Sequence, residues 1–432
     1  MVMRLDSGTG EFEAQFSALL ATKREVSEDV DAAVREIIDD VRQRGDQALI
    51  DLTRKFDRVD LSDTGLRVSD AEIDEAVSRV DAETYAALEF AHGRIAAHHQ
   101  RQLPKDDLYE DEAGATLGYR WTAVEAAGLY VPGGTASYPS SVLMNAVPAR
   151  VAGVERIAMV VPTPDGEINP LVFAAARLAG VQEIYRIGGA QAVAALAFGT
   201  ESVAPVSVIV GPGNAYVAAA KRQVFGTVGI DMIAGPSEVL VVADAENDPD
   251  WIAADLLAQA EHDTSAQSIL MTDSTEFGEA VADAVARQLK QLSRGEIAGE
   301  SWDRFGAIIV VQSLDETPAL VDRVAPEHLE IATADPESLI GRIRNAGAIF
   351  VGRYTPEVIG DYVAGPNHVL PTARSARFSS GLGVLDFMKR SSILKLGPET
   401  LAALATSAMT LAKAEGLEAH SRSVAIRLNQ ER

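Results

Sequence analysis

The stretch RIAMVVPTPDGEINPLVFAAARLAGVQEIYRIGGAQAVAALAFGTESVAPVSVIVGPGNAYVAAAKRQVF, residues 156–225, decides the fold. Short runs rich in β-branched residues alternate in it with Ala-rich runs that have helical spacing. The expected strands cover 156–162, 183–187 and 207–210, and the expected helices cover 170–179, 190–198 and 215–225. Such alternation is typical of βαβ units, whose strands lie parallel in one sheet.

A second set of strands and helices follows the first. It begins with the run 238–243, and its first helix has a clear start, because Asp248 suits the cap and Pro249 the first helical position. Further strands are expected at 268–271, 307–311, 329–331 and 348–351, with helices between them. We therefore predict an α/β fold with two Rossmann-like parallel-sheet domains, at 120–237 and 238–380.

The first part of the chain has a helical character. Residues 25–44 and 70–102 carry apolar residues every three or four positions between charges, which predicts amphipathic helices. We expect this mainly helical region, residues 1–115, to pack on the second α/β block. The polar stretch 105–112 is expected to be a solvated connection.

The charge balance excludes several kinds of partner. The 432 residues include 38 Lys and Arg against 63 Asp and Glu, which gives a net charge of −25. Nucleic acid and anionic membranes both need a basic footprint, so neither is expected as a partner. The chain has no cysteine, which excludes thiolate metal sites and cysteine nucleophiles.

The composition also bears on location. Glu11 and Glu13 stand where a signal peptide would need an apolar run, and no stretch reaches the roughly eighteen apolar residues of a membrane span. These features predict a cytoplasmic protein. Few Lys residues and abundant Asp favour adaptation to a salty cytoplasm, where self-repulsion of surface charge is screened. The alternative is an acidic enzyme without that adaptation.

Three Gly-rich turns each lie between an expected strand and an expected helix. They cover 131–134, 188–189 and 211–214. In open parallel sheets such turns lie at the carboxyl ends of strands, where ligands bind, and Asn214 suits a helix N-cap at an anion site. Because no G-x-G-x-x-G is present, the turns are equally well interpreted as connections that need positive φ.

Histidines beside carboxylates or amides are the candidates for chemistry. Gln259 and His262 share a helix face and could hold one metal ion. His328 directly follows Glu327, and a carboxylate beside an imidazole resembles an acid/base pair. Nitrogen and oxygen ligands without sulfur would suit zinc. Each histidine taken singly is more often structural, and the chain has neither H-E-x-x-H nor G-x-S-x-G.

A series of motifs runs in one order from about residue 30 to the end of the chain. They are G-L-Y-V-P-G-G at 128–134, Y-P-S-S-V-L-M at 138–144, G-G-A-Q-A at 188–192, G-P-G-N at 211–214, I-D-M at 230–232, A-G-P-S-E at 234–238, Q-A-E-H at 259–262, P-E-H-L at 326–329, G-D-Y at 360–362 and N-H-V-L-P-T at 367–372. The series resembles the histidinol dehydrogenase family. The resemblance implies a zinc-dependent enzyme that oxidises L-histidinol to L-histidine through L-histidinal with two NAD⁺, the last step of histidine biosynthesis.

The resemblance also implies the residues of the site. One zinc ion per subunit would be held by Gln259, His262, Asp361 and His420. The substrate would contact these four residues together with Ser237, His328 and Glu415. The NAD⁺ contacts would be Tyr130, Gln191 and Asn214. Glu327 and His328 would be catalytic: neutral His328 has a suitable pKa to take the hydroxyl proton, and Glu327 would activate the water that hydrates the aldehyde.

Members of this family are homodimers in which the C-terminal segment reaches into the partner's site. The tail 385–432 has predicted helices at 398–415 and 421–430, so Glu415 and His420 would serve the neighbouring subunit. One departure from the family is Ser207-Val208, where Asp-Lys is usual; it leaves the detailed packing near the cofactor open, but not the reaction.

Two other functions are considered. One is a related NAD-dependent dehydrogenase of another small alcohol, such as a sulfonated diol, which would have little need of Glu415 and His420. The other is a non-catalytic relative that binds a metal or ligand, which would not be expected to keep Glu327 and His328.

Overall fold

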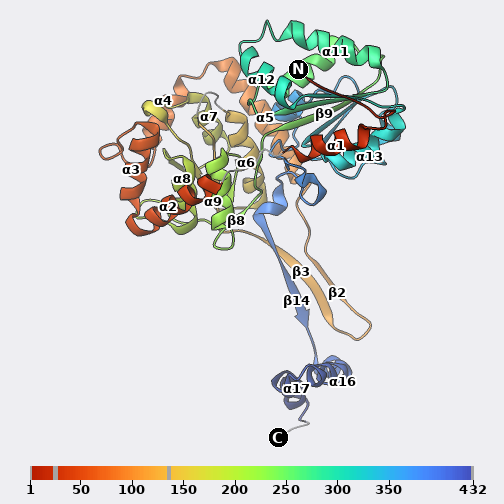
Figure 1. The fold of residues 1–432 in the computed structure, drawn as a ribbon. Helices are drawn as coiled ribbons and strands as arrows, with labels where there is room; N and C mark the ends of the chain where they lie inside the picture. Colours follow the sequence, from red (N-terminus) through yellow and green to blue (C-terminus); the bar gives the residue numbers. More distant parts are fainter. Residues whose placement is uncertain (1, 23–27, 134–137, 430–432) are drawn as a thin grey trace.

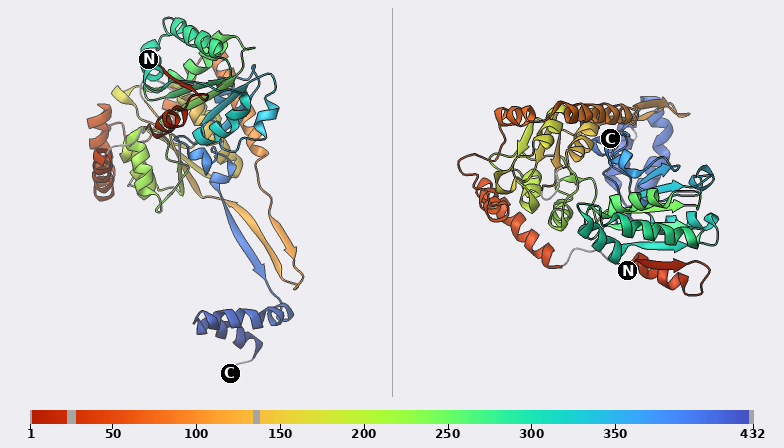
Figure 2. Two further views of the ribbon diagram at one scale, coloured as in Figure 1. Left: turned by 45° about the vertical axis from the view of Figure 1, so that its right-hand side comes forward. Right: turned by 90° about the horizontal axis from the view of Figure 1, so that it is seen from above.

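The computed structural model describes residues 2–22, 28–133 and 138–429, and two parallel β-sheets form the body of the chain (Figure 1). An arm of antiparallel strands descends from this body and ends in a pair of helices (Figures 1 and 2). The predicted α/β class is confirmed. The strands and helices predicted between residues 156 and 351 are observed, with small shifts at their ends.

The first sheet is doubly wound. Within the described residues its strands are, in spatial order, β6 (Glu183–Tyr185), β5 (Arg156–Val160), β4 (Ala126–Tyr130), β7 (Val208–Val210) and β8 (Gly229–Ile230). All neighbours are parallel. The chain starts in the middle at β4, moves to one edge and returns to the other, so β4 and β7 diverge into a crevice at their carboxyl ends.

Helices cover both faces of this sheet. One face packs against α4 (Asp70–Ser78), α5 (Ala82–Gln100), α6 (Pro139–Ala152) and α7 (Pro170–Leu178). The other packs against α2 (Glu28–Arg44), α3 (Asp46–Asp57), α8 (Gly189–Phe198) and α9 (Ala215–Val224). The amphipathic pattern at 70–102 is divided into two helices, because the Asp81 side chain accepts a hydrogen bond from the Thr84 N–H and caps the second.

The expected packing of residues 1–115 on the second α/β block is wrong for most of that region. The helices α2 to α5 all lie on the first sheet. Within the described residues, the part that joins the second sheet is β1 (Met3–Asp6) with α1 (Phe12–Ala21). An amphipathic pattern shows that a helix has a buried face, but not which sheet covers that face.

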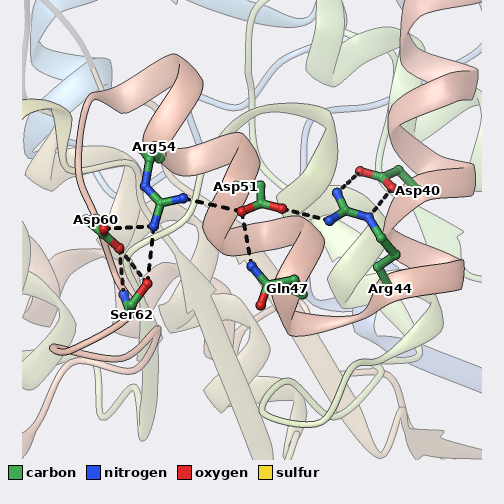
Figure 3. A network of polar contacts seen from close by, with 7 residues as sticks. All are labelled: Asp40, Arg44, Gln47, Asp51, Arg54, Asp60 and Ser62. Carbon is green, nitrogen blue, oxygen red and sulfur yellow. Dashed lines mark hydrogen bonds and ion pairs between the residues drawn. The ribbon is translucent and has the colours of Figure 1, made fainter.

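Polar contacts join α2 to α3 at their corner (Figure 3). The Arg44 guanidinium bonds Asp40 on its own helix and Asp51 on α3, and Arg54 bonds Asp51 and Asp60. These side chains are half exposed, and exposed ion pairs each contribute at most about 1 kcal/mol. The network therefore sets the orientation of α3 relative to α2. The stability of the two helices comes mainly from burial of their apolar side chains against α8 and α9.

The second sheet repeats the doubly wound order with one added strand. Its strands in the described residues are β1, β11 (Ala307–Val310), β10 (Gln267–Thr272), β9 (Glu238–Ala243), β12 (His328–Ala332) and β13 (Ala348–Val351), all parallel. The helices α10 (Pro249–Ala260), α11 (Thr275–Gln288) and α12 (Gly295–Phe305) pack on one face. The helices α1, α13 (Thr317–Val324) and α14 (Glu337–Ile340) pack on the other. The short helix α15 (Glu357–Tyr362) follows β13.

The arm consists of β2 (Asp107–Glu110), β3 (Thr116–Ala123) and β14 (Met388–Lys395). The prediction of a solvated connection at 105–112 is therefore wrong, because an exposed strand without a buried face has no apolar alternation to reveal it. The helices α16 (Pro398–Ala414) and α17 (Glu418–Ala425) end the arm. Among the described residues, no helix has the length and apolar character needed to cross a membrane.

Candidate active site

The carboxyl edge of the first sheet brings the three expected cofactor residues to one place. Tyr130 is the last residue of β4, and its buried phenol oxygen accepts a hydrogen bond from the Gly189 N–H at 3.0 Å. The buried Gln191 side chain lies over the same turn, with Oε1 2.7 Å from where a Cβ on Gly189 would stand. Burial raises the pKa of Tyr130 to about 12, so its phenol is neutral and can donate a hydrogen bond.

The turn after β7 completes this edge. Gly211 has φ +111°, and a Cβ there would overlap the carbonyl oxygen of Tyr130, so this position requires glycine. Asn214 is exposed and caps α9 as predicted, since its Oδ1 accepts from the Tyr216 N–H at 3.0 Å. Its amide nitrogen remains available for a ligand. Gly134 of the first Gly-rich turn lies outside the described residues.

The expected acid/base pair lies at the start of β12, at the amino edge of the second sheet. Glu327 and His328 are both buried. The Glu327 carboxylate accepts from the Glu238 N–H at 2.9 Å, and His328 Nδ1 lies 3.0 Å from the Glu238 carbonyl oxygen, to which it can only donate. The Nδ1–H tautomer leaves Nε2 as the basic nitrogen, and that atom is buried without a hydrogen-bond partner in the described residues.

Carboxylates surround the His328 imidazole. Its Nε2 lies 3.7 Å from Asp361 Oδ1, and its Nδ1 lies 3.8 Å from Glu327 and 3.9 Å from Glu357. Burial alone would lower the pKa of His328, but the neighbouring carboxylates raise it well above its ordinary value. Burial raises the pKa of Glu327 to about 7 and that of Glu357 to about 8. Glu327 and Glu357 can thus exchange protons near neutrality, whereas His328 holds its proton to a higher pH than an ordinary imidazole.

The expected metal residues of the body come from two elements that pack together. Gln259 and His262 lie at the carboxyl end of α10, and Asp361 lies on α15. The Gln259 amide is buried, and its Nε2 has no hydrogen-bond partner in the described part of the chain. Desolvation lowers the pKa of His262, which favours the neutral imidazole that a metal needs. An amide, an imidazole and a carboxylate are a fitting but incomplete zinc set, and the described residues contain no cluster of three or more His, Asp or Glu placed to hold a metal.

Hydrogen bonds connect this region to the first sheet. His368 Nδ1 donates to the Asp361 carbonyl oxygen at 2.9 Å, and its Nε2 lies 3.5 Å from the Ser141 hydroxyl on α6. The neighbouring Asn367 amide donates to the Met144 carbonyl oxygen of α6 at 2.6 Å. The carboxyl edge of the first sheet, where α6 begins, therefore meets the amino edge of the second sheet.

Ser237 directly precedes β9, beside the Glu238 backbone that anchors Glu327 and His328. Sequence reasoning missed Ser141 and Glu357. A serine in an apolar helix and a glutamate after a proline give no signal of their own, and both are recognised by what they contact.

Glu415 and His420 stand apart from the other site residues of their own chain. They are exposed, and they belong to the helix pair at the far end of the arm (Figures 1 and 2). One chain therefore does not bring all four expected metal ligands together.

Two doubly wound sheets, one with Gly-rich turns at its carboxyl edge and one with a buried carboxylate–imidazole pair at its amino edge, are the arrangement expected of an α/β dehydrogenase. Comparison with known proteins identifies the family. The family model described as histidinol dehydrogenase matches residues 20–428. The chain is 68% identical to a histidinol dehydrogenase of Rhizobium meliloti over 99% of both chains. It is 66% identical to one of Bradyrhizobium diazoefficiens, over 99% of this chain and 100% of the relative.

The crystal structure of histidinol dehydrogenase from Elizabethkingia anophelis superimposes with a TM-score of 0.94 at 36% identity, covering 99% of this chain and 98% of that one. The chain belongs to the histidinol dehydrogenase family. It is an NAD-dependent dehydrogenase of histidine biosynthesis.

Proposed function

We propose that the chain oxidises L-histidinol to L-histidine through L-histidinal, using two NAD⁺ and one zinc ion per subunit. The observation that supports this most directly is the buried His328, whose Nδ1 is anchored on the side of Glu327 and whose Nε2 lies 3.7 Å from Asp361 with no hydrogen-bond partner among the described residues. A fixed base next to a second carboxyl group suits two successive oxidations with a hydration between them.

The chain's own residues perform the proton transfers in this proposal. The neutral His328 imidazole takes the hydroxyl proton of histidinol on its Nε2. At the same time a hydride leaves the carbon that carries this hydroxyl group and passes to NAD⁺. Glu327 then takes a proton from the water that adds to the aldehyde, and His328 returns the proton it took to the aldehyde oxygen, which gives the hydrate and restores the neutral imidazole. His328 takes a hydroxyl proton of the resulting hydrate as the second hydride leaves, and the carboxylic acid forms. The burial of both residues limits escape of the aldehyde to water.

The metal and the cofactor have separate places in this proposal. Gln259, His262 and Asp361 would hold zinc, which when bound orients the substrate imidazole and amine and favours the alkoxide. Tyr130, Gln191 and Asn214 would hold NAD⁺ across the turns of the first sheet. Ser237 would contact the substrate from the start of β9.

The tail completes the site in a homodimer. The exposed apolar side chains of the arm and its helices, which include Leu394, Leu404 and Leu411, are unusual for a segment that projects into solvent. We propose that the tail 385–432 docks on a second copy, where His420 joins the metal and Glu415 contacts the substrate. The domains at 120–237 and 238–380 would then supply cofactor and substrate residues to one pocket, in a cytoplasmic enzyme.

The stoichiometry of NADH tests the reaction. Limiting L-histidinol with excess NAD⁺ should give two NADH per substrate, with activity lost to a chelator and restored by zinc. One NADH would contradict the role of Glu327, and no NADH would turn attention to sulfonated diols and to a non-catalytic relative. His328→Asn should lower kcat by about 10²–10⁴ without weakening substrate binding, whereas His92→Asn on α5 serves as a matched control.

Mixing two inactive variants tests the exchanged tail. His328→Asn disables the body and His420→Ala disables the tail, so a mixed dimer has one intact site if the tails are exchanged. A refolded equimolar mixture should then recover about a quarter of wild-type activity. A mixture that stays inactive would show that the tail does not serve the neighbouring subunit.

A further inference from the structure

A buried ion pair lies directly beneath the turn that ends in Asn214. Lys221 is on α9 and Asp231 follows β8, and their side chains are 2% and 1% exposed. Lys221 Nζ donates both to Asp231 Oδ1 and, at 2.9 Å, to the Gly211 carbonyl oxygen. The other oxygen, Asp231 Oδ2, accepts from the Gly211 N–H at 2.8 Å.

The pair thus engages both backbone polar groups of Gly211. Asp231 is itself held by the Met232 N–H at 2.6 Å. Gly211 has a positive φ and lies against the Tyr130 backbone, so its peptide orientation decides where the next residues of the turn go. Lys221 and Asn214 belong to one helix, at its interior and its cap, so the turn is fastened at both ends.

Stability alone does not account for this arrangement. Removing two charges from water is costly, and replacing a buried pair by apolar residues is often neutral or stabilising. The pair lies within an otherwise apolar core formed by α8, α9 and the first sheet. The distinctive property of the Lys221–Asp231 pair is geometric, because the pair fixes the Gly211 backbone at the proposed cofactor edge of the first sheet.

We propose that Lys221 and Asp231 are positioning residues for the cofactor: they hold the 211–214 turn so that the Asn214 amide faces NAD⁺. This inference rests on the proposed cofactor role of Tyr130, Gln191 and Asn214. Neither Lys221 nor Asp231 touches the cofactor, and both act through Gly211.

The test compares cofactor affinity with turnover in the full-length enzyme. Lys221→Met should raise KM for NAD⁺ about tenfold or more, while kcat at saturating NAD⁺ and KM for histidinol stay within about threefold of wild type. Arg222→Met on the same helix removes the exposed ion pair with Asp31 and should leave all three constants unchanged. Equal KM values for NAD⁺ in Lys221→Met and wild type would overturn the proposal.

The double variant Lys221→Met/Asp231→Asn separates positioning from folding. It leaves no buried charge unpaired, so its melting temperature should return toward that of wild type while KM for NAD⁺ stays high. Recovery of both quantities would show a merely structural pair and would overturn the proposal.

Asn214→Ala distinguishes failure of this inference from failure of the proposed cofactor site. A raised KM for NAD⁺ in Asn214→Ala with no change in Lys221→Met would remove the positioning role and leave the site standing. No change in either variant would reject the cofactor turn and the positioning role together.

Discussion

Gly211→Ala tests the close contact between the turn after β7 and the end of β4. The residue has φ +111°, and an added Cβ would overlap the Tyr130 carbonyl oxygen and lie 3.1 Å from its carbonyl carbon. These are backbone atoms of a buried strand, so no side-chain rotation relieves the overlap. Strain at positive φ costs about 1–3 kcal/mol, and forced overpacking costs about 1–3 kcal/mol more. We expect the free energy of unfolding to fall by about 3–5 kcal/mol, together with a higher KM for NAD⁺.

Gly226→Ala is the matched control. Gly226 has φ +102°, but nothing lies within 4 Å of its added Cβ, so the substitution introduces the strain without the overlap. Urea denaturation should show a loss of about 1–2 kcal/mol for this variant. If the two variants lose the same stability within about 0.5 kcal/mol, the argument from close backbone contact is refuted.

Three further predictions concern the rest of the molecule. Burial raises the pKa of Glu330 well above its ordinary value, so the folded state keeps a proton that the unfolded state has released, and stability falls as pH rises from that ordinary value toward the folded pKa. Glu330→Gln, which is neutral at every pH, should therefore stabilise the chain more at pH 8 than at pH 5 in urea titrations; equal gains at both would contradict this. Asp248→Ala removes the cap that accepts from the Asp250 N–H at 2.9 Å, and should cost about 1 kcal/mol of unfolding free energy. If the acidic surface is adapted to salt, raising KCl from about 0.1 M to about 2 M should raise the melting temperature by screening repulsion, and a fall would favour the unadapted alternative.

The order of strands and helices could be predicted from the sequence because each element has a recognisable pattern within its own residues. The run 239–243 is continuous and apolar, and Asp248 with Pro249 marks the next helix; both elements appear as expected. Packing partners are set by contacts between distant segments, which local periodicity does not encode. That is why α2 to α5 were assigned to the wrong sheet.

Charge within a buried strand is a signal that the sequence did contain. Glu330 stands in the middle of H-L-E-I-A, where apolar residues are expected, and it proves to be 3% exposed. Its Oε1 accepts from the Glu357 N–H at 2.6 Å, which holds Glu357 beside His328. An acidic residue in a core strand indicates that other titratable groups lie close to it, although the sequence does not identify which residues these are.

The departure at Ser207-Val208 can be placed relative to the proposed cofactor edge. Ser207 lies at the amino end of β7, whereas the Gly211 turn lies at the carboxyl end of the same strand. Its backbone keeps the sheet pairing, since its N–H donates to Ala126 and its carbonyl accepts from Gly229. The departure therefore lies at the opposite end of β7 from the Gly211 turn.

The position of the proposed acid/base pair departs from the general rule that ligands bind at the carboxyl ends of parallel strands. This rule directs attention to Tyr130 and the Gly211 turn, where we propose that NAD⁺ binds. In the second sheet, however, His328 begins its strand, so the groups that handle protons lie at the amino edge. The two edges meet through α6, where Ser141 contacts His368. In the proposed reaction, NAD⁺ held on one sheet and His328 on the other would approach the same substrate carbon from two sides.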